Sequence, residues 1–169
     1  GAANQAPGHS AGLVFGGYKS PAGPTNATEE YNGTSWTSSN NMTTSRQRLA
    51  GAGIQTAGLA FGGGYPPTAH SETEEYDGSS WTNGGGLGTA RGRLGGSGTQ
   101  TAGLAFGGST VAEPPSKTNA TEEYDGSSWT AGGALSVPRF MLGGGGTQTA
   151  GIAFGGNTNP PPGHTNSTE

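Results

Sequence analysis

Adjacent glutamates are the residues of this sequence whose type best suits acid–base catalysis, and they form three pairs: Glu29 and Glu30, Glu74 and Glu75, and Glu122 and Glu123. Hydrolysis by a carboxylate pair needs the two carboxyl groups on either side of one bond. Each pair lies in a strand-like segment, and neighbouring side chains of a strand point to opposite faces. We therefore expect these carboxylates to be solvated or paired with arginine, and not to act together on a substrate.

The remaining chemistry-bearing residues give no sign of a metal site or a nucleophile. His9, His70 and His164 have no metal-ligand spacing with one another or with a carboxylate. The chain has no cysteine, which excludes disulfides, thiolate metal sites and a cysteine nucleophile. There is no Ser-His-Asp arrangement, and the glycine clusters do not lie between a strand and a helix, as a phosphate-binding loop requires. The sequence predicts no enzyme, no metal and no cofactor.

Charge and hydropathy exclude two further classes of function. The seven lysines and arginines are spread singly, so no basic stripe is available to neutralise phosphates. No apolar run approaches the roughly 20 residues that span a bilayer. The first four residues do not look like a signal peptide, so we expect any secretion signal to lie outside this sequence. The sequence predicts neither nucleic-acid binding nor membrane insertion.

The composition is unusual for a folded domain. Leu, Ile, Val and Phe together number only 18, while Gly contributes 36 residues and Pro 11. Such a chain is expected to be disordered or of low complexity unless a period organises it. A period is present: four similar segments, 11–17, 57–63, 102–108 and 150–156, are spaced by 46, 45 and 48 residues.

Each repeat carries the same residue types at fixed distances. A Thr-Glu-Glu-Tyr segment is followed by Asn-Gly or Asp-Gly, then a tryptophan five residues after the tyrosine, and an arginine ten residues after the tryptophan. The recurring positions are the diglycines Gly16 and Gly17, Gly62 and Gly63, Gly107 and Gly108, and Gly155 and Gly156, then Tyr31, Tyr76 and Tyr124, Trp36, Trp81 and Trp129, and Arg46, Arg91 and Arg139. A special site usually breaks repetition, so we expect the tyrosines and tryptophans to form the core within and between repeats.

The pattern within a repeat predicts four short antiparallel strands, which we call a, b, c and d. In the third repeat they correspond to residues 94–100, 102–108, 121–125 and 127–130. Alternating apolar residues in strand b are typical of a half-buried strand. The Asn-Gly or Asp-Gly pair between c and d is a strong hairpin signal, and the diglycine that ends b permits a sharp bend.

This order of a strand, a diglycine, Tyr, Trp and Arg resembles the kelch repeat over nearly the whole chain. Kelch repeats each form one four-stranded blade of a β-propeller, so the resemblance implies an all-β fold of such blades. It also implies that Arg46, Arg91 and Arg139 pack between strands. The extra Gly and Thr and the small residues of strand b depart from the kelch pattern and imply a lightly packed blade. The repeat is also similar to kelch-like repeats of phage and environmental viral proteins.

Galactose oxidase shares the kelch propeller, but its chemistry does not follow here. Its copper site uses a thioether-linked Tyr–Cys, and this chain has no cysteine.

The repeats form one tandem region, 1–169, with units of about 1–47, 48–92, 93–139 and 140–169, the last being incomplete. Propellers usually close with about 4 to 8 blades, so three and a half blades do not close a ring alone. Three interpretations stay open. The chain is a fragment of a longer protein, which we favour, or its last blade is completed by another copy in an oligomer or filament, or the repeats stack as an open solenoid.

The connections between strands b and c differ most among the repeats. They cover residues 18–26, 64–70, 109–117 and 157–164. Because the strands are antiparallel, the b–c and d–a connections should emerge on one face. Loops on a rigid scaffold commonly carry recognition, although loops also vary when nothing selects them.

Five of the ten asparagines stand in Asn-X-Ser/Thr sequons: Asn26, Asn32, Asn41, Asn119 and Asn166. Asn26, Asn119 and Asn166 share one repeat position at the end of the b–c connection, where repeat 2 has Ser71. We expect a glycan at that position to point into water. Asn32 is less suited because it lies in the tight c–d turn.

These observations predict a non-catalytic module at a cell exterior or virion surface, of the tail-fibre or appendage type, which presents the b–c connections to a structural protein or a surface glycan. The alternative is a protomer of a glycosylated extracellular filament that self-associates through its incomplete last blade. The open edge of the strand at residues 150–154 motivates this alternative, because an edge offers backbone groups to another chain.

Overall fold

The computed structural model describes all residues except 1, 6–9, 65–67, 111–116 and 159–166, and the side chains of 2–5. The described residues form sixteen β-strands and no helix, which confirms the all-β fold that the sequence predicts. Sheet 1 contains β1 (Ala2–Gln5), β2 (Gly12–Phe15), β5 (Thr28–Tyr31) and β6 (Trp36–Ser39). Sheet 2 contains β7 (Ala50–Ile54), β8 (Ala57–Phe61), β9 (Thr73–Tyr76) and β10 (Trp81–Gly84). Sheet 3 contains β11 (Gly95–Gly98), β12 (Gly103–Phe106), β13 (Thr121–Tyr124) and β14 (Trp129–Ala131).

The last repeat contributes a smaller sheet. Sheet 4 pairs β15 (Gly143–Gly146) with β16 (Gly151–Phe154), and an isolated bridge joins Phe154 to Thr168 at the start of the expected strand c. A separate two-stranded hairpin, β3 (Tyr18–Lys19) with β4 (Gly23–Pro24), lies within the first b–c connection. In sheets 1 to 3 the four strands of each repeat therefore pair in the predicted order a, b, c, d.

The strand boundaries differ from the prediction at strand d. The sequence predicts that Ser127 and Ser128 belong to this strand, but it begins at Trp129, directly opposite Tyr124. The two serines lie in the turn, because the Asp125 carboxylate accepts hydrogen bonds from both of their backbone N–H groups at 2.8 Å. The side chain captures donors that strand pairing would otherwise use.

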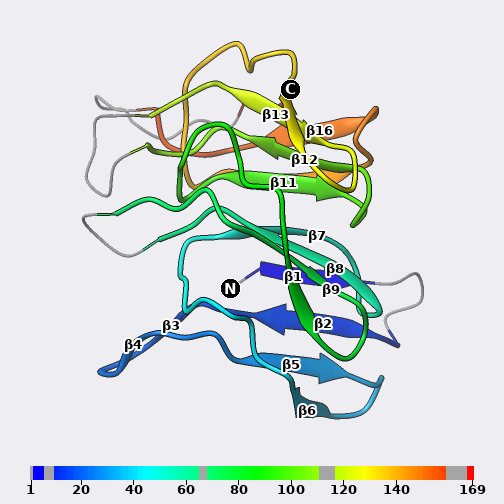
Figure 1. The fold of residues 1–169 in the computed structure, drawn as a ribbon. Helices are drawn as coiled ribbons and strands as arrows, with labels where there is room; N and C mark the ends of the chain where they lie inside the picture. Colours follow the sequence, from blue (N-terminus) through cyan, green and yellow to red (C-terminus); the bar gives the residue numbers. More distant parts are fainter. Residues whose placement is uncertain (1, 6–9, 65–67, 111–116, 159–166) are drawn as a thin grey trace.

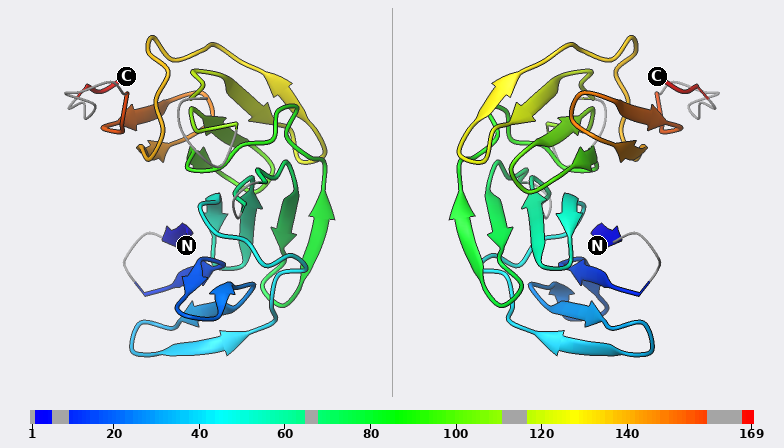
Figure 2. Two further views of the ribbon diagram at one scale, coloured as in Figure 1. Left: turned by 90° about the vertical axis from the view of Figure 1, so that its left-hand side faces the viewer. Right: turned by 90° about the vertical axis from the view of Figure 1, so that its right-hand side faces the viewer.

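The sheets stand side by side around a common axis and form an open arc (Figures 1 and 2). The four a strands, β1, β7, β11 and β15, lie along the inner side of the arc, and the d strands lie along its outer side. Both ends of the chain lie at the open side of the arc in Figure 2. The described residues do not form a closed ring.

Few apolar residues suffice because glycine lets neighbouring sheets approach closely. A Cβ at Gly58 would lie 2.8 Å from Leu13, and one at Gly103 would lie 2.7 Å from Leu59. The same residue types therefore meet at successive contacts between sheets, which we call seams. The diglycines bend the chain after strand b, with φ angles of 63° and 96° at Gly62 and Gly63, a region that residues with a Cβ rarely adopt.

Candidate functional site

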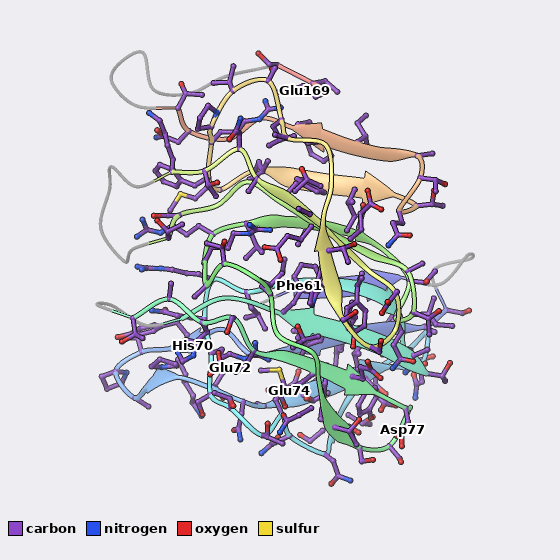
Figure 3. All side chains as sticks on the ribbon, turned by 45° about the horizontal axis from the view of Figure 1, so that its top comes forward. Phe61, His70, Glu72, Glu74, Asp77 and Glu169 are labelled. Carbon is purple, nitrogen blue, oxygen red and sulfur yellow. The ribbon has the colours of Figure 1, made fainter. Side chains whose placement is uncertain are left out.

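The first glutamate of the second and third pairs, Glu74 and Glu122, is a structural partner for a buried arginine. Arg46 is fully buried, and its Nη2 lies 2.9 Å from Oε1 of Glu74 on β9. Its Nη1 donates to the carbonyls of Gly62 and Glu72 at 2.9 and 2.6 Å. Burial lowers the pKa of Arg46, and the charge of Glu74 opposes that shift. Figure 3 labels Glu74 among the strands of sheet 2.

The same ion pair recurs at the next two seams. Arg91 Nη1 lies 3.0 Å from Glu122 Oε1, in a geometry that makes an ion pair without a straight hydrogen bond. Arg139 Nη2 lies 2.5 Å from Glu169 Oε1. In each case the arginine belongs to the d–a connection of one repeat, and the glutamate belongs to the next repeat.

The second glutamate points to the opposite face and accepts a tyrosine hydroxyl from the following sheet. Tyr76 donates to Glu30, and Tyr124 donates to Glu75. Burial raises the pKa of Tyr124, and the neighbouring Glu75 carboxylate raises it further. The paired glutamates therefore face different partners, and the described structure brings no glutamate pair together on one bond.

The tryptophans belong to the same seams. Trp81 Nε1 donates to Thr28 Oγ1 at 3.0 Å, and its ring packs edge-on against Phe15 with centroids 5.0 Å apart. Trp129 Nε1 donates to Thr73 Oγ1 at 2.9 Å.

Sequence reasoning missed the role of these threonines. It also missed a second seam contact, made by glutamine. Gln100 and Gln148 donate to the carbonyls of Tyr76 and Tyr124 at 2.7 Å. The threonines recur as the first residue of Thr-Glu-Glu-Tyr, and the glutamines recur in Gly-Thr-Gln-Thr. This recurrence was the signal in the sequence that could have indicated a role for both.

Each end sheet leaves uncovered some residues whose repeat equivalents are buried. Trp36 is 47% exposed, whereas its repeat equivalent Trp81 is 7% exposed. The expectation that Trp36 forms core between repeats is wrong for this chain, because no described sheet packs on that face. At the other end, Ile152 and Phe154 are 44% and 47% exposed.

The b–c and d–a connections share one face, as the strand order predicts. The backbone N–H groups of Met42, Leu87 and Leu135 in the d–a connections donate to b–c carbonyls at 2.8 to 2.9 Å. In Figure 3, His70 and Glu72 lie toward one side of the molecule, and Asp77 of the c–d turn lies at the other. We call the face formed by these connections the loop rim.

Two of the sequon asparagines of the loop rim, Asn26 and Asn119, hold the connections together by hydrogen bonds, and the expectation that a glycan there points into water stays a prediction. Asn26 Nδ2 donates to the Met42 carbonyl at 2.9 Å, and Asn119 Nδ2 donates to the Leu135 carbonyl at 3.0 Å. Both side chains are half-buried and tie the b–c connection to the d–a connection.

The other sequons lie in different settings. Asn32 is exposed, and its Oδ1 accepts the N–H groups of Thr34 and Ser35 at 3.0 Å within the c–d turn. Asn41 is exposed on the loop rim. Asn166 lies outside the described residues.

The histidines do not form a metal site in the described part of the chain. His70 Nδ1 lies 3.0 Å from Glu72 Oε2 on the loop rim, whereas His9 and His164 lie outside the described residues. Within the described ranges, no group of three or more His, Asp and Glu side chains is placed to hold a metal ion. Nor do those ranges contain a helix with the length and hydropathy needed to cross a bilayer.

Comparison with known proteins adds no family to this description. No protein-family model matches the sequence, and no curated protein matches it either. Within the described structure, most of the repeated charged and aromatic side chains lie in seams. The most variable segments lie on the loop rim.

Proposed function

We propose that the chain is a non-catalytic, kelch-like β-propeller segment of an extracellular or virion-surface appendage, which uses its loop rim to bind a structural protein or a surface glycan. The observation that carries this proposal is the division of roles within each repeat. Arginine, glutamate, tyrosine and tryptophan are engaged in seams, whereas the b–c connections change from repeat to repeat. A rigid scaffold with variable loops is a common arrangement for recognition.

The described part of the loop rim offers side chains suited to such contacts. Tyr18 on β3 is 54% exposed, and a tyrosine ring supplies a large contact surface together with a hydroxyl group. His70 and Glu72 add a polar pair on the second connection. The exposed sequon at Asn41 supports an extracellular location, because glycans attach to such sites in secreted proteins.

Binding to an array of surface glycans tests this proposal, with Tyr18→Ala and His70→Ala as rim variants. We expect both variants to keep the circular dichroism of the parent chain and to lose binding to whichever glycan it retains. Trp36→Ala, on the uncovered face of sheet 1 and outside the b–c connections, is the control and should keep binding. Glycan binding that survives both rim changes and depends on Trp36 would contradict the role of the loop rim.

The second candidate is a structural protomer that assembles end to end into an extracellular filament. The uncovered faces of sheets 1 and 4 support it, because they carry a tryptophan and a phenylalanine, the residue types that meet at the seams between sheets 1 and 2 and between sheets 2 and 3. Trp36 of one copy and Phe154 of the next would pack as Trp81 packs on Phe15. Such a head-to-tail contact generates a ring or a helical polymer. Light scattering across a range of concentrations tests it, and a monomer at every concentration would exclude the filament.

A further inference from the structure

Ile54 departs from the repeat pattern in the turn between strands a and b. In repeats 3 and 4 the equivalent residues are Thr99 and Thr147. Their hydroxyl oxygens accept the backbone N–H groups of Ala102 and Ala150 at 3.1 Å, which caps each turn. Isoleucine has no acceptor for this bond, and the side chain of Ile54 is 42% exposed. Neither the turn nor the core therefore accounts for an isoleucine at this position.

A cavity of about 230 Å³ lies beside Ile54, between two successive a–b turns. Ile54 and Ala57 line it from repeat 2, and residues 98–101 line it from repeat 3. Its volume is well above the roughly 30 Å³ that one water molecule occupies in the liquid. Sheets 2 and 3 each pack between two other sheets, so the cavity does not depend on an end of the arc. We call it the turn pocket.

The walls of the turn pocket are held in place by the seam between sheets 2 and 3. Gln100 Nε2 donates to the carbonyl oxygens of Gly58 and Tyr76 at 3.2 and 2.7 Å, which ties the a–b turn of repeat 3 to β8 and β9. The surface of the pocket is mostly apolar, with Ile54 and Ala57 as its aliphatic side chains. A preformed apolar pocket of this kind suits an apolar side chain.

The c–d turns beside the turn pocket carry negative charge. A Cβ at Gly126 would lie 3.4 Å from the Cβ of Thr101, so the c–d turn of repeat 3 packs against a wall of the pocket. Asp125 precedes Gly126, and its equivalent in repeat 2 is Asp77. Both aspartates are exposed, and hydrogen bonds from backbone N–H groups lower their pKa to about 2, so both are charged at neutral pH. We call the face formed by the a–b and c–d turns the turn face.

All the lysines and arginines of the sequence lie on the opposite face. Each of the seven belongs to a b–c or a d–a connection: Lys19, Arg46, Arg48, Arg91, Arg93, Lys117 and Arg139. The turn face therefore has no lysine or arginine to balance Asp77 and Asp125. Such a surface is complementary to a basic partner.

We propose that the turn pocket binds an aliphatic side chain of a basic peptide segment from a partner protein. The aliphatic side chain packs on Ile54 and Ala57, and lysines or arginines on either side of it pair with Asp77 and Asp125. Burial of the apolar anchor supplies affinity, and the charge pairs supply specificity and faster association. The turn pocket lies on the face opposite the loop rim, so this binding and the proposed function can fail independently.

The test titrates the full, isotope-labelled chain with an acetylated peptide of sequence Lys-Lys-Leu-Lys-Lys, followed by nuclear magnetic resonance. We expect saturable one-to-one binding, with the largest shifts at Ile54, Ala57 and Thr101. Replacing the peptide leucine with serine should weaken binding by about tenfold or more, because a buried anchor dominates such contacts. Raising the salt concentration from about 0.01 M to about 1 M shortens the Debye length from about 30 Å to about 3 Å, and should weaken binding several-fold.

Two protein variants sharpen the test. Ile54→Thr introduces the threonine of repeats 3 and 4, so it should keep the circular dichroism of the parent chain and unfold at a higher temperature. It should nevertheless bind the leucine peptide about tenfold less tightly. Val137→Thr is the matched control, because Val137 is also a β-branched aliphatic residue, is 45% exposed and lies in a d–a connection. It should leave the affinity for the peptide unchanged.

Three results would overturn the proposal. The first is the absence of saturable shifts at Ile54 with millimolar leucine peptide, and the second is equal binding of the serine peptide, which would show attraction by charge alone. The third is self-association of the chain that Ile54→Thr abolishes and the leucine peptide does not reverse, because a second copy would then occupy the turn pocket. If Ile54→Thr does not fold, the comparison of the two peptides still decides.

Discussion

At the residue scale, the repeated ion pairs are the contacts most sensitive to change. Arg46 and Glu74 are both fully buried, and they stand 28 residues apart in the sequence. A buried pair contributes little relative to an apolar pair, but removing one partner leaves an uncompensated charge in a medium of low dielectric constant. Replacing either the arginine or the glutamate of a buried pair should therefore destabilise the fold strongly.

Glu74→Gln should lower the free energy of unfolding by about 3 kcal/mol, because Arg46 keeps its charge and loses its counter-ion. Urea denaturation followed by circular dichroism measures this change. Glu29→Gln is the matched control, because Glu29 holds the same repeat position, is exposed and makes no described contact with an arginine. It should change stability by less than about 0.5 kcal/mol. Equal losses in the two variants would contradict the assigned role.

The aspartates of the c–d turns should make the folded chain less stable as the pH falls into the acid range. Hydrogen bonds from the backbone of Ser80 and Ser79 lower the pKa of Asp77 to about 2, and equivalent bonds from Ser128 and Ser127 do so for Asp125. The unfolded value is about 3.9, so this stabilisation is complete above about pH 4 and is lost as the pH falls toward 2.

Replacing both residues by asparagine, as in Asn32 of the first repeat, should flatten that part of the profile. Thermal unfolding between pH 5 and about pH 2 measures the slope. An unchanged slope in the Asp77→Asn and Asp125→Asn double variant would show that the turns do not cause it.

At the element scale, the connections are fixed by side chains as well as by backbone pairing. Asn26 and Asn119 donate to the d–a connection in repeats 1 and 3. Repeat 2 has Ser71 at this position, and there only the backbone bond from Leu87 N–H to the Ser71 carbonyl is present.

Ser71→Asn should therefore stabilise the unglycosylated chain by about 1 kcal/mol, by adding the missing hydrogen bond to the Leu87 carbonyl. Asn119→Ala should destabilise it by about the same amount, whereas Asn41→Ala, at an exposed sequon, should have little effect. Differential scanning calorimetry on the three variants provides the comparison. A destabilised Ser71→Asn variant would contradict the stabilising hydrogen bond that we assign to an asparagine at this position.

The strands and turns could largely be predicted from the sequence, because neighbouring residues in the chain determine them. Alternating apolar residues indicate β12, and Asp125-Gly126 indicates the turn between β13 and β14. The start of β14 was missed because side-chain capture of Ser127 competes with strand pairing. The partner of each arginine could not be assigned, because Glu74 lies in the next repeat and only the packing of sheets brings it to Arg46. The half-buried setting of Asn26 depends on the same packing.

At the scale of the whole molecule, the described residues form an open arc in which each sheet packs against the next one along the chain (Figure 2). The stability of such an array is approximately a sum of terms for each repeat and each seam. Replacing a repeated residue should therefore lower the free energy of unfolding where a neighbouring sheet covers that residue. The same replacement at an uncovered end should lower it little. The seams engage the repeated residues, and the recognition that we propose therefore falls to the loop rim and to the turn pocket.

A side-by-side measurement of the unfolding of Trp81→Ala and Trp36→Ala tests this central claim most directly. The two tryptophans hold one repeat position, but only Trp81 contacts a preceding sheet, through Phe15 and Thr28. We predict that Trp81→Ala loses about 3 kcal/mol or more, as large buried aromatics do, and that Trp36→Ala loses less than about 1 kcal/mol. Equal losses would mean that Trp36 is covered in solution, and would contradict the open arc described here.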